Sequence, residues 1–356
     1  MTGSKRSAEW EWADQTPAVP SNQAQFQPGA QQTLPADAPS LPKAKSKATT
    51  PKKKFRDMGV LECNAFLTEM EKRDFPVIFQ AMLDAERVEH DLMKQTALQT
   101  ALAGALRGKK PSPEFLEQLR AFVTNSSNSQ SDRDWVFGAL GHAATPETVE
   151  LLAHVATSSP DPKIRESAAG SLGTVGAGMG AGEKLSPILE RVWRESSDPV
   201  LLRSVSPEMA KVGAASSIEL LLTAALATDD RDKVRHDVAR DALREVYQDN
   251  AVPPLAARLA NQPPTSEAVK LVAPLLARIS NAAANKALVG WLQGRSENAA
   301  PLVHDLIVQH MLDDPFKSAW ADALDPNVPF KNEENRKAIR TALDAYRAGR
   351  TSVPPK

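Results

Sequence analysis

The sequence DPKIRESAAGSLGTVG, at residues 161–176, indicates the fold of this chain more strongly than any other stretch. It opens with an aspartate, continues through Arg165 to the small pair Ala168 and Ala169, and closes with a Leu-Gly step at Gly173. An aspartate at a helix start accepts hydrogen bonds from free backbone N–H groups and faces the positive end of the helix dipole. Small residues let a neighbouring helix approach closely. The stretch therefore predicts one closely packed helix.

The same pattern returns along the chain, at residues 198–213 and 232–243 and more weakly at 132–141. The predicted first helices of these units begin near Asp132, Asp161, Asp198, Asp230, Thr265 and Glu297. Their starts are 29 to 37 residues apart, and each interval has room for two helices. Such a unit cannot bury its apolar side alone, so neighbouring units stack into one continuous core. The period predicts an α-solenoid.

The repeated stretches resemble the HEAT-like repeat, in the short bacterial form that is also found in phycobilisome lyases. The unit at residues 161–196 matches best, and the resemblance extends over residues 132–312. It implies an all-α fold, a right-handed α-solenoid of HEAT-like helix pairs. In the family, recurring acidic and arginine residues form a ladder between neighbouring repeats. The positions that match this ladder loosely are Asp161, Arg165, Asp198, Arg203, Asp232 and Arg235. We therefore assign these charges to structure.

Composition and periodicity divide the chain into four parts. Residues 1–56 are predicted to be a disordered tail or linker, because a segment rich in Pro, Gln and Lys buries too little apolar surface to offset the entropy of ordering. Residues 57–130 form an N-terminal helical capping region, residues 131–312 the HEAT-like repeats, and residues 313–356 a C-terminal helical cap with a short tail. Aromatic residues make up only 5% of the chain, which favours packed helices over an aromatic-rich β fold.

Individual helices are predicted from apolar spacing and from start and stop residues. Residues 58–84 read as two helices divided at a proline, and a longer helix is expected from about Glu86 to Leu106. Ser112 opens the next helix, which should end by Asn125.

Two tryptophans are predicted to lie in the core. Trp193 continues the apolar stripe that starts at Leu185, and Trp291 repeats this arrangement in a later second helix. The final helix, at about residues 332–348, has one apolar face and charges elsewhere. It is expected to act as the polar cap that a stacked array needs for solubility.

The charge of the chain is unevenly distributed. Its formal net charge is −1, yet residues 1–56 hold nine basic and four acidic residues, and residues 57–356 carry a net charge of −6. The candidate contact residues at the basic end of the tail are Lys52, Lys53, Lys54 and Arg56. A flexible polybasic stretch can make weak contacts with phosphates or anionic lipid, and the alternative is a solvated spacer.

The sequence offers no recognisable motif for catalysis or metal binding. Its one cysteine, Cys63, excludes an internal disulfide and a multi-cysteine metal site. The six histidines lack the spacing of zinc ligands on a helix. The glycines at residues 173–182 lie between helices, without the preceding strand that a phosphate-binding loop requires. We expect no catalytic residue, no cofactor and no metal.

These observations favour a non-catalytic scaffold that binds a protein or peptide partner on the concave face of the solenoid. On this interpretation the second helices line the concave face, and their exposed basic residues contact the partner. The candidates are Lys184, Arg191, Arg194, Arg258 and Arg278. Two other classes stay open: a nucleic-acid-binding protein similar to HEAT-like DNA glycosylases, and a protein similar to the chromophore lyases. Fold analogy alone does not decide among them.

The expected compartment is the cytoplasm, because the first residues do not form the apolar segment of a secretory signal. The alternative is the periplasm, if an anchor lies upstream of this chain. No run of about 18 apolar residues occurs, so no transmembrane segment is expected. The protein is expected to be a monomer by itself.

Overall fold

The computed structural model describes residues 55–175, 182–228, 232–279, 281–302, 306 and 329–351, and all regular secondary structure within them is helical. The elements are η1 (Phe55–Asp57), α1 (Val60–Glu71), α2 (Phe75–Arg87), α3 (Leu92–Gly108), α4 (Pro113–Thr124), α5 (Gln130–Ala143), α6 (Pro146–Ser158), α7 (Pro162–Leu172), α8 (Gly182–Glu195), α9 (Pro199–Val212), α10 (Ala215–Ala225), α11 (Lys233–Leu243), η4 (Asp249–Ala251), α12 (Val252–Leu259), α13 (Glu267–Ile279), α14 (Ala282–Gln293) and α17 (Glu333–Thr351). The all-α prediction is confirmed. Nearly all of the predicted tail, residues 1–54, lies outside the described residues.

Of the aspartates predicted to start first helices, Asp161 and Asp198 cap them, whereas Asp230 lies outside the described residues and Asp232 caps α11 instead. A carboxylate oxygen of Asp161 accepts from the backbone N–H of Lys163 at 2.9 Å, and Asp198 caps α9 through the N–H of Val200 at the same distance. Asp232 caps α11 through the backbone N–H of the third helical residue, at 3.2 Å. Each cap satisfies a backbone donor at the helix start that has no intrahelical partner.

The predicted start near Asp132 is three residues late. Ser129 caps α5, and its Oγ accepts from the backbone N–H of Asp132 at 3.0 Å. Asp132 is buried, and its carboxylate instead accepts two hydrogen bonds from Arg87 of the preceding repeat, at 3.0 and 2.5 Å. Asp132 therefore lies in the first turn of α5 and links this helix to the preceding repeat.

The N-terminal helices follow the prediction with one exception. The structure separates α1 from α2 close to the predicted proline, and α4 ends at Thr124, just before Asn125. The single helix expected from Glu86 to Leu106 is wrong, because the chain turns between α2 and α3. His90 takes a left-handed conformation there, with φ +50°, and Asp91 caps α3 by accepting from the N–H of Lys94 at 3.0 Å. A polar cap here starts a new helix within an apparently continuous pattern.

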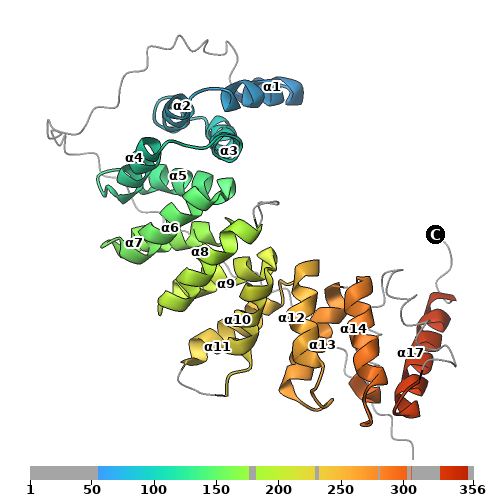
Figure 1. Ribbon diagram of the computed structural model, residues 1–356. Helices are drawn as coiled ribbons and strands as arrows, with labels where there is room; N and C mark the ends of the chain where they lie inside the picture. Colours follow the sequence, from blue (N-terminus) through green and yellow to red (C-terminus); the bar gives the residue numbers. More distant parts are fainter. Residues whose placement is uncertain are drawn as a thin grey trace, which may run out of the picture. The chain divides into compact units, whose positions relative to one another are not determined.

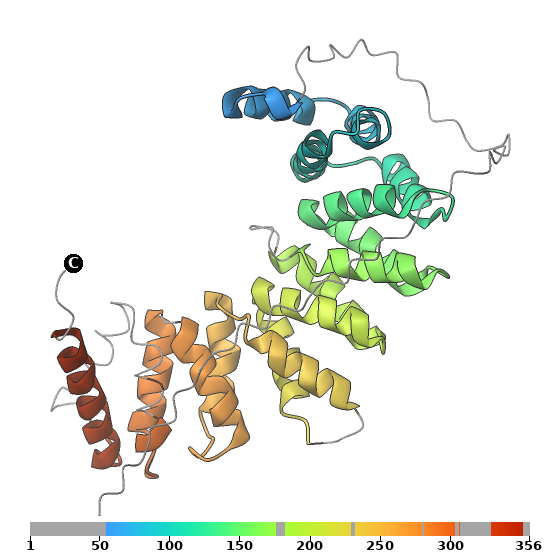
Figure 2. The ribbon, with the colours of Figure 1, turned by 180° about the vertical axis from the view of Figure 1, so that it is seen from behind.

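Helices pack on one another in two parallel series. The first helices α3, α5, α7, α9 and α11 contact in that order, and the second helices α4, α6, α8, α10, α12 and α14 do likewise (Figures 1 and 2). From α5 to α13 the first helices start 32, 37, 34 and 34 residues apart, and α17 starts 66 residues after α13. The repeat period predicted from the sequence is therefore present in the structure. The predicted boundaries of the two capping regions remain an expectation.

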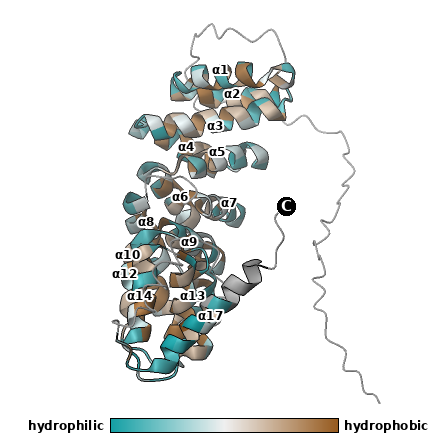
Figure 3. Ribbon diagram, turned by 90° about the vertical axis from the view of Figure 1, so that its right-hand side faces the viewer, coloured by the Kyte–Doolittle hydropathy of each residue, from teal (hydrophilic) through white to brown (hydrophobic). Residues whose placement is uncertain are grey.

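The core lies between these two series. Figure 3 shows hydrophobic and hydrophilic positions on the same helices, as expected for elements with one buried side. Trp193 and Trp291 are 3% and 5% exposed, so the prediction that they belong to the core is confirmed. An arginine guanidinium lies over each ring, Arg235 at 5.8 Å from the Trp193 centroid and Arg295 at 5.9 Å from that of Trp291. Each tryptophan thus also orders a charged side chain.

Close approach between successive first helices depends on glycine. A Cβ on Gly141 of α5 would lie 2.6 Å from the backbone oxygen of Ser171 at the end of α7. Gly173, which caps α7, lies against the backbone of Ser204 in α9. Gly213 at the end of α9 has φ +68°, a conformation that side chains with a Cβ rarely adopt.

Large exposed apolar side chains are concentrated at the N-terminal end of the array, from α1 to α3. In the described part of the chain they include Val60, Leu61, Val88, Leu92 and Met93. Among the described residues, we find no helix whose length and hydropathy would let it cross a membrane.

Candidate functional site

The five basic residues predicted to contact a partner lie on three helices. Lys184, Arg191 and Arg194 are on α8, and Arg258 is on α12, both of which are second helices. Arg278 is on α13, which packs as the first helix of the pair α13–α14, so its assignment to the second helices is wrong. The other four share the surface formed by the exposed sides of the second helices, which we call the second-helix surface.

Two of these arginines bind the second helix of the preceding repeat. Arg191 donates from one Nη to both carboxylate oxygens of Glu150 on α6, at 2.7 and 2.8 Å. Arg258 pairs with Glu219 on α10 and also donates to the hydroxyl of Thr223 at 2.9 Å. Both ion pairs are partly exposed, so each contributes modestly to stability. Their guanidinium groups are engaged within the protein.

Arg194 takes part in a more buried network on α8. It contacts the carboxylate of Glu190 at 3.1 Å, and the Glu190 side chain is only 7% exposed. The same carboxylate accepts hydrogen bonds from the hydroxyls of Ser216 and Ser217 on α10, at 2.6 and 2.9 Å. These hydrogen bonds stabilise the charge that burial would otherwise destabilise. The network joins two successive repeats.

Arg278 serves as a connection between first helices. One Nη donates to the backbone oxygens of Leu243 and Val246, just at and beyond the end of α11, at 3.3 and 2.9 Å. Burial lowers the pKa of Arg278 from its ordinary value. Backbone oxygens at a helix end lack intrahelical partners and carry partial negative charge, so a cation there is favourable.

Lys184 differs from the other four. It is exposed, and it forms no hydrogen bond or ion pair with any residue in the described part of the chain. The tail residues Lys52, Lys53 and Lys54 lie outside the described residues, and so does the side chain of Arg56. The second-helix surface therefore offers one exposed, unpaired lysine among the predicted contacts, together with charges that are already paired.

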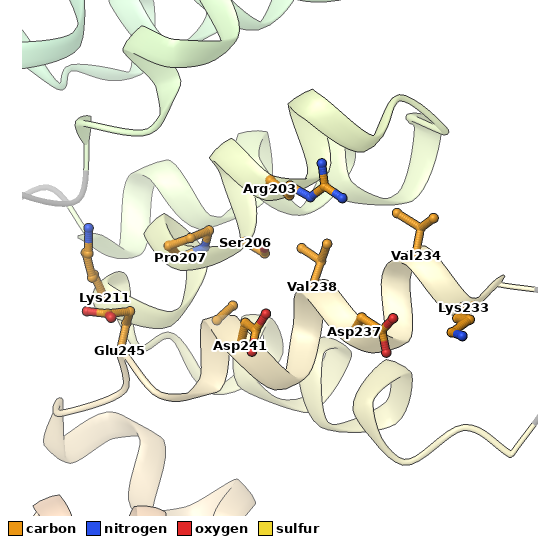
Figure 4. Close-up of a pocket in the computed structure, with 11 residues that line it drawn as sticks. Arg203, Ser206, Pro207, Lys211, Lys233, Val234, Asp237, Val238, Asp241 and Glu245 are labelled. Atoms are coloured by element: carbon orange, nitrogen blue, oxygen red, sulfur yellow. The ribbon is translucent and has the colours of Figure 1, made fainter. Parts of the chain in front are cut away.

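A groove lies elsewhere, between the first helices α9 and α11. It has a volume of about 590 Å³ and is open to solvent. The residues that line it are Arg203, Ser206, Pro207, Lys211, Lys233, Val234, Asp237, Val238, Asp241, Ala242 and Glu245 (Figure 4). We call it the α9–α11 groove. Its volume falls within the range of sites that bind small ligands or short peptide segments.

The two walls of the groove differ in charge. The α9 wall carries Arg203 and Lys211, whereas α11 carries Lys233 at its start and then Asp237 and Asp241, with Glu245 two residues beyond the helix end. Residues four apart lie on the same side of a helix, one turn after another. Asp237 and Asp241 therefore lie on the same side of α11, and the Glu245 carboxylate follows beyond the end of the helix.

One end of the groove is held by a buried ion pair. Lys211 Nζ lies 2.8 Å from the carboxylate of Glu208, whose side chain is 1% exposed. This hydrogen bond raises the pKa of Lys211 above its ordinary value, and the charge of Glu245 adds to the effect. Figure 4 shows Lys211 and Glu245 side by side at this end, with Lys233 at the other. The charge of Lys211 is therefore largely neutralised within the protein.

Arg203 behaves differently from the other arginines near the starts of first helices. Arg133 and Arg165, each four residues after its N-cap, donate to backbone oxygens of the loop before their own helix, at 3.2 and 2.8 Å. Arg235, three residues after its cap, donates to the backbone oxygen of Ser196. Arg203 is five residues after Asp198 and forms no hydrogen bond or ion pair with any described residue. One further residue turns the side chain by about 100° around the helix, toward the groove.

Arg203 matches the expected ladder between repeats in sequence, but in the structure it does not take part in one. The aspartates of the expected ladder, Asp161, Asp198 and Asp232, cap their own helices. Its arginines Arg165 and Arg235 donate to backbone oxygens. The signal in the sequence is the distance from the cap to the arginine, which in α9 is one residue longer than in α5 and α7 and two residues longer than in α11. Among the described residues, no group of three or more His, Cys, Asp or Glu side chains is arranged to hold a metal ion.

Comparison with known proteins identifies the repeat. The sequence family of HEAT repeats matches residues 112–206, which include α4 to α8 and the first half of α9. The repeats in this range are HEAT repeats. The resemblance noted in the sequence is thereby confirmed for this range, which also holds Arg203 and Ser206 of the groove.

Other comparisons are more distant. The structure of human deoxyhypusine hydroxylase in complex with glycerol is similar to this chain with 18% sequence identity and a TM-score of 0.28. The alignment covers 82% of this chain and 100% of that one. No curated protein sequence matches this chain.

Proposed function

We propose that the protein is a non-catalytic HEAT-repeat scaffold that binds a segment of a partner protein. The observation that carries this proposal is the α9–α11 groove, where an unpaired Arg203 faces solvent beside apolar and acidic side chains. Solenoids bind partners through extended surfaces made of consecutive helices. A groove between two such helices offers shape and charge without any requirement for reaction chemistry.

The second-helix surface is the other place where a partner can bind, and Lys184 is its best candidate contact. There, however, Arg191, Arg194 and Arg258 already bind carboxylates within the chain. A partner would have to compete with these internal pairs for the same guanidinium groups. For this reason we favour the α9–α11 groove over the surface expected from the sequence.

Site-specific photocrosslinking tests the proposal. A photoreactive amino acid is placed at Val234 in the groove, at Lys184 on the second-helix surface, or at Met93 on α3 as an exposed control. Each protein is incubated with an extract of the source cells and irradiated. We expect a discrete crosslinked partner at Val234 that is lost when Arg203→Glu is added.

The outcomes separate the two surfaces. A partner captured only at Lys184 would assign the binding surface to the second helices and contradict the groove. Equal capture at all three positions, or capture at Val234 that is unaffected by Arg203→Glu, would show non-specific contact. In either case the groove would lose its proposed function.

A further inference from the structure

The charges of the α9–α11 groove indicate which kind of segment it binds, an inference that rests on the proposed function. Arg203 presents an unpaired guanidinium on the α9 wall, and the nearest analogous arginines are engaged with backbone oxygens. A guanidinium offers several donors in a plane that matches a carboxylate. The position of Arg203 therefore favours an acidic group in the ligand.

The α11 wall favours the opposite charge. Within the described part of the chain, Asp237 contacts only the ring nitrogen of its neighbour His236, at 3.0 Å, and Asp241 is 3.4 Å from Arg244 in a pair whose side chains are 74% and 76% exposed. Such exposed pairs are weak and exchange readily with another cation. Both carboxylates are thus available to a basic group in the ligand.

The floor between the two walls is apolar. Val238 is nearly buried between the helices, Val234 is 39% exposed at one end, and Pro207 and Ala242 complete the lining. In Figure 4, Val238 of α11 lies opposite Arg203 of α9. An aliphatic side chain placed here would lose contact with water on both sides, while charged groups beside it reach the two walls.

The length of the groove limits the size of the ligand. From Lys233 to Leu243, α11 covers ten helical steps, or about 15 Å, and Glu245 lies just beyond the helix end. An extended chain advances about 3.3 Å per residue, so about five residues fit. Side chains two residues apart in an extended segment point to the same side, so charged residues two positions before and after an aliphatic residue face the groove together with it.

We infer that the α9–α11 groove binds an extended peptide segment of about five residues, in which an aliphatic side chain lies between one acidic and one basic residue. The acidic residue contacts Arg203, the basic residue contacts Asp237 and Asp241, and the aliphatic residue covers Val238. The segment belongs to a partner protein. A nucleic acid fits less well, because its phosphates would approach the carboxylates of Asp237, Asp241 and Glu245.

Synthetic peptide pools test this assignment with the full-length protein. Each fluorescent pool has a central leucine flanked two residues away by a fixed pair: Glu and Lys in both orders, Glu and Glu, Lys and Lys, or Gln and Gln. Binding is followed by fluorescence anisotropy, and a single-stranded oligonucleotide serves as a further probe. We expect the Glu and Lys pool to bind about fivefold more tightly than the Gln pool.

Charge reversal gives the sharper result. Arg203→Glu should weaken binding of the Glu and Lys pool about tenfold and make the Lys and Lys pool the preferred one. Lys184→Glu, which changes an exposed and unpaired lysine outside the groove, should leave the order of the pools unchanged. Arg203→Gln supplies a second variant if the reversed one fails to fold, with the preference for Glu lost.

Other results would overturn the inference. Equal binding of all pools, absence of binding by any pool, or an order unaffected by Arg203→Glu would each show that the assigned chemistry is wrong. Oligonucleotide that displaces the peptides would assign the groove to nucleic acid. If crosslinking at Val234 succeeds while the pools fail, the groove binds a partner of another chemistry; if the crosslinking fails as well, the proposed function falls with it.

Discussion

The replacement Gly141→Ala tests the close packing of successive first helices. An added Cβ would lie 2.6 Å from the backbone oxygen of Ser171 and 2.5 Å from Oγ1 of Thr174. The threonine hydroxyl can rotate, but the Ser171 oxygen belongs to the last turn of α7 and accepts a hydrogen bond from Thr174 Oγ1 at 2.8 Å. Relief of the clash therefore requires movement of the backbone, and α5 and α7 must separate.

The magnitude follows from two opposing effects. Overpacking of a well-packed site costs about 1–3 kcal/mol, whereas replacing a helical glycine by alanine gains about 1 kcal/mol. Because a backbone atom must move, we expect the clash to dominate and the free energy of unfolding to fall by about 1–2 kcal/mol. For a chain of this size, the corresponding fall in Tm is about 2–3 °C.

Gly170→Ala is a matched control in the adjacent helix. Gly170 lies in α7, and a Cβ there meets nothing within 4 Å. This variant should gain roughly 0.5–1 kcal/mol, because it removes only the entropic cost of glycine. Thermal unfolding followed by circular dichroism should therefore move the two Tm values in opposite directions.

Hydrogen exchange measured by mass spectrometry locates the effect. Repeats contact only their neighbours, so Gly141→Ala should reduce amide protection in α5 and α7 and leave α12 and α14 unchanged. The double variant Gly141→Ala/Thr174→Ala should not recover the lost stability, since the obstacle is a backbone oxygen. The reasoning is refuted if Gly141→Ala is as stable as Gly170→Ala, or if removal of the threonine hydroxyl restores it.

Three further predictions concern polar contacts between repeats. Arg278→Ala removes the donor to two backbone oxygens at the end of α11 and should cost about 1–2 kcal/mol in denaturant unfolding, with faster hydrogen exchange at that helix end. Asn335 is buried, donates to the Glu297 oxygen at 3.1 Å and accepts from the Ala299 N–H at 2.8 Å, so Asn335→Ala should cost about 1–3 kcal/mol, measured in the same way. The pKa of Lys211 is higher in the folded state than in the unfolded state, so protonated Lys211 stabilises the fold below its unfolded pKa, and this contribution is lost as the pH rises through the folded pKa. Denaturant unfolding at increasing pH should therefore show a smaller loss of stability at alkaline pH for Lys211→Met than for the unchanged protein.

Helix positions were predictable where local chemistry determines them. Asp161 and Asp198 cap helices in the structure as expected, because a carboxylate before an amphipathic run has one favourable place. The break at His90 was missed, since a left-handed residue other than glycine leaves little trace in apolar spacing. The helical repeat followed from periodicity, while the buried pair between Asp132 and Arg87 depends on contacts 45 residues apart.

The partner contacts were harder to predict, because exposure alone does not show whether a charge is available. Arg191 and Arg258 look free in the sequence, yet each meets a glutamate on the second helix of the preceding repeat. Such pairs join residues 39 and 41 positions apart, so they depend on the register between repeats. A helix can be placed from its own residues, but this register depends on how two helices pack.

Arg203, the proposed contact of the groove, illustrates how a repeat protein can expose a charged residue without a change of fold. In α5 and α7 an arginine four residues after the cap stabilises the loop before the helix, and in α11 an arginine after three residues binds a neighbouring loop. In α9 the fourth position is Leu202, which is buried, and the arginine follows it. A shift of one residue thus replaces a structural hydrogen bond with apolar packing and turns the guanidinium toward the groove. Because leucine retains the core contact, the repeat keeps its packing while the displaced charge becomes available to a ligand.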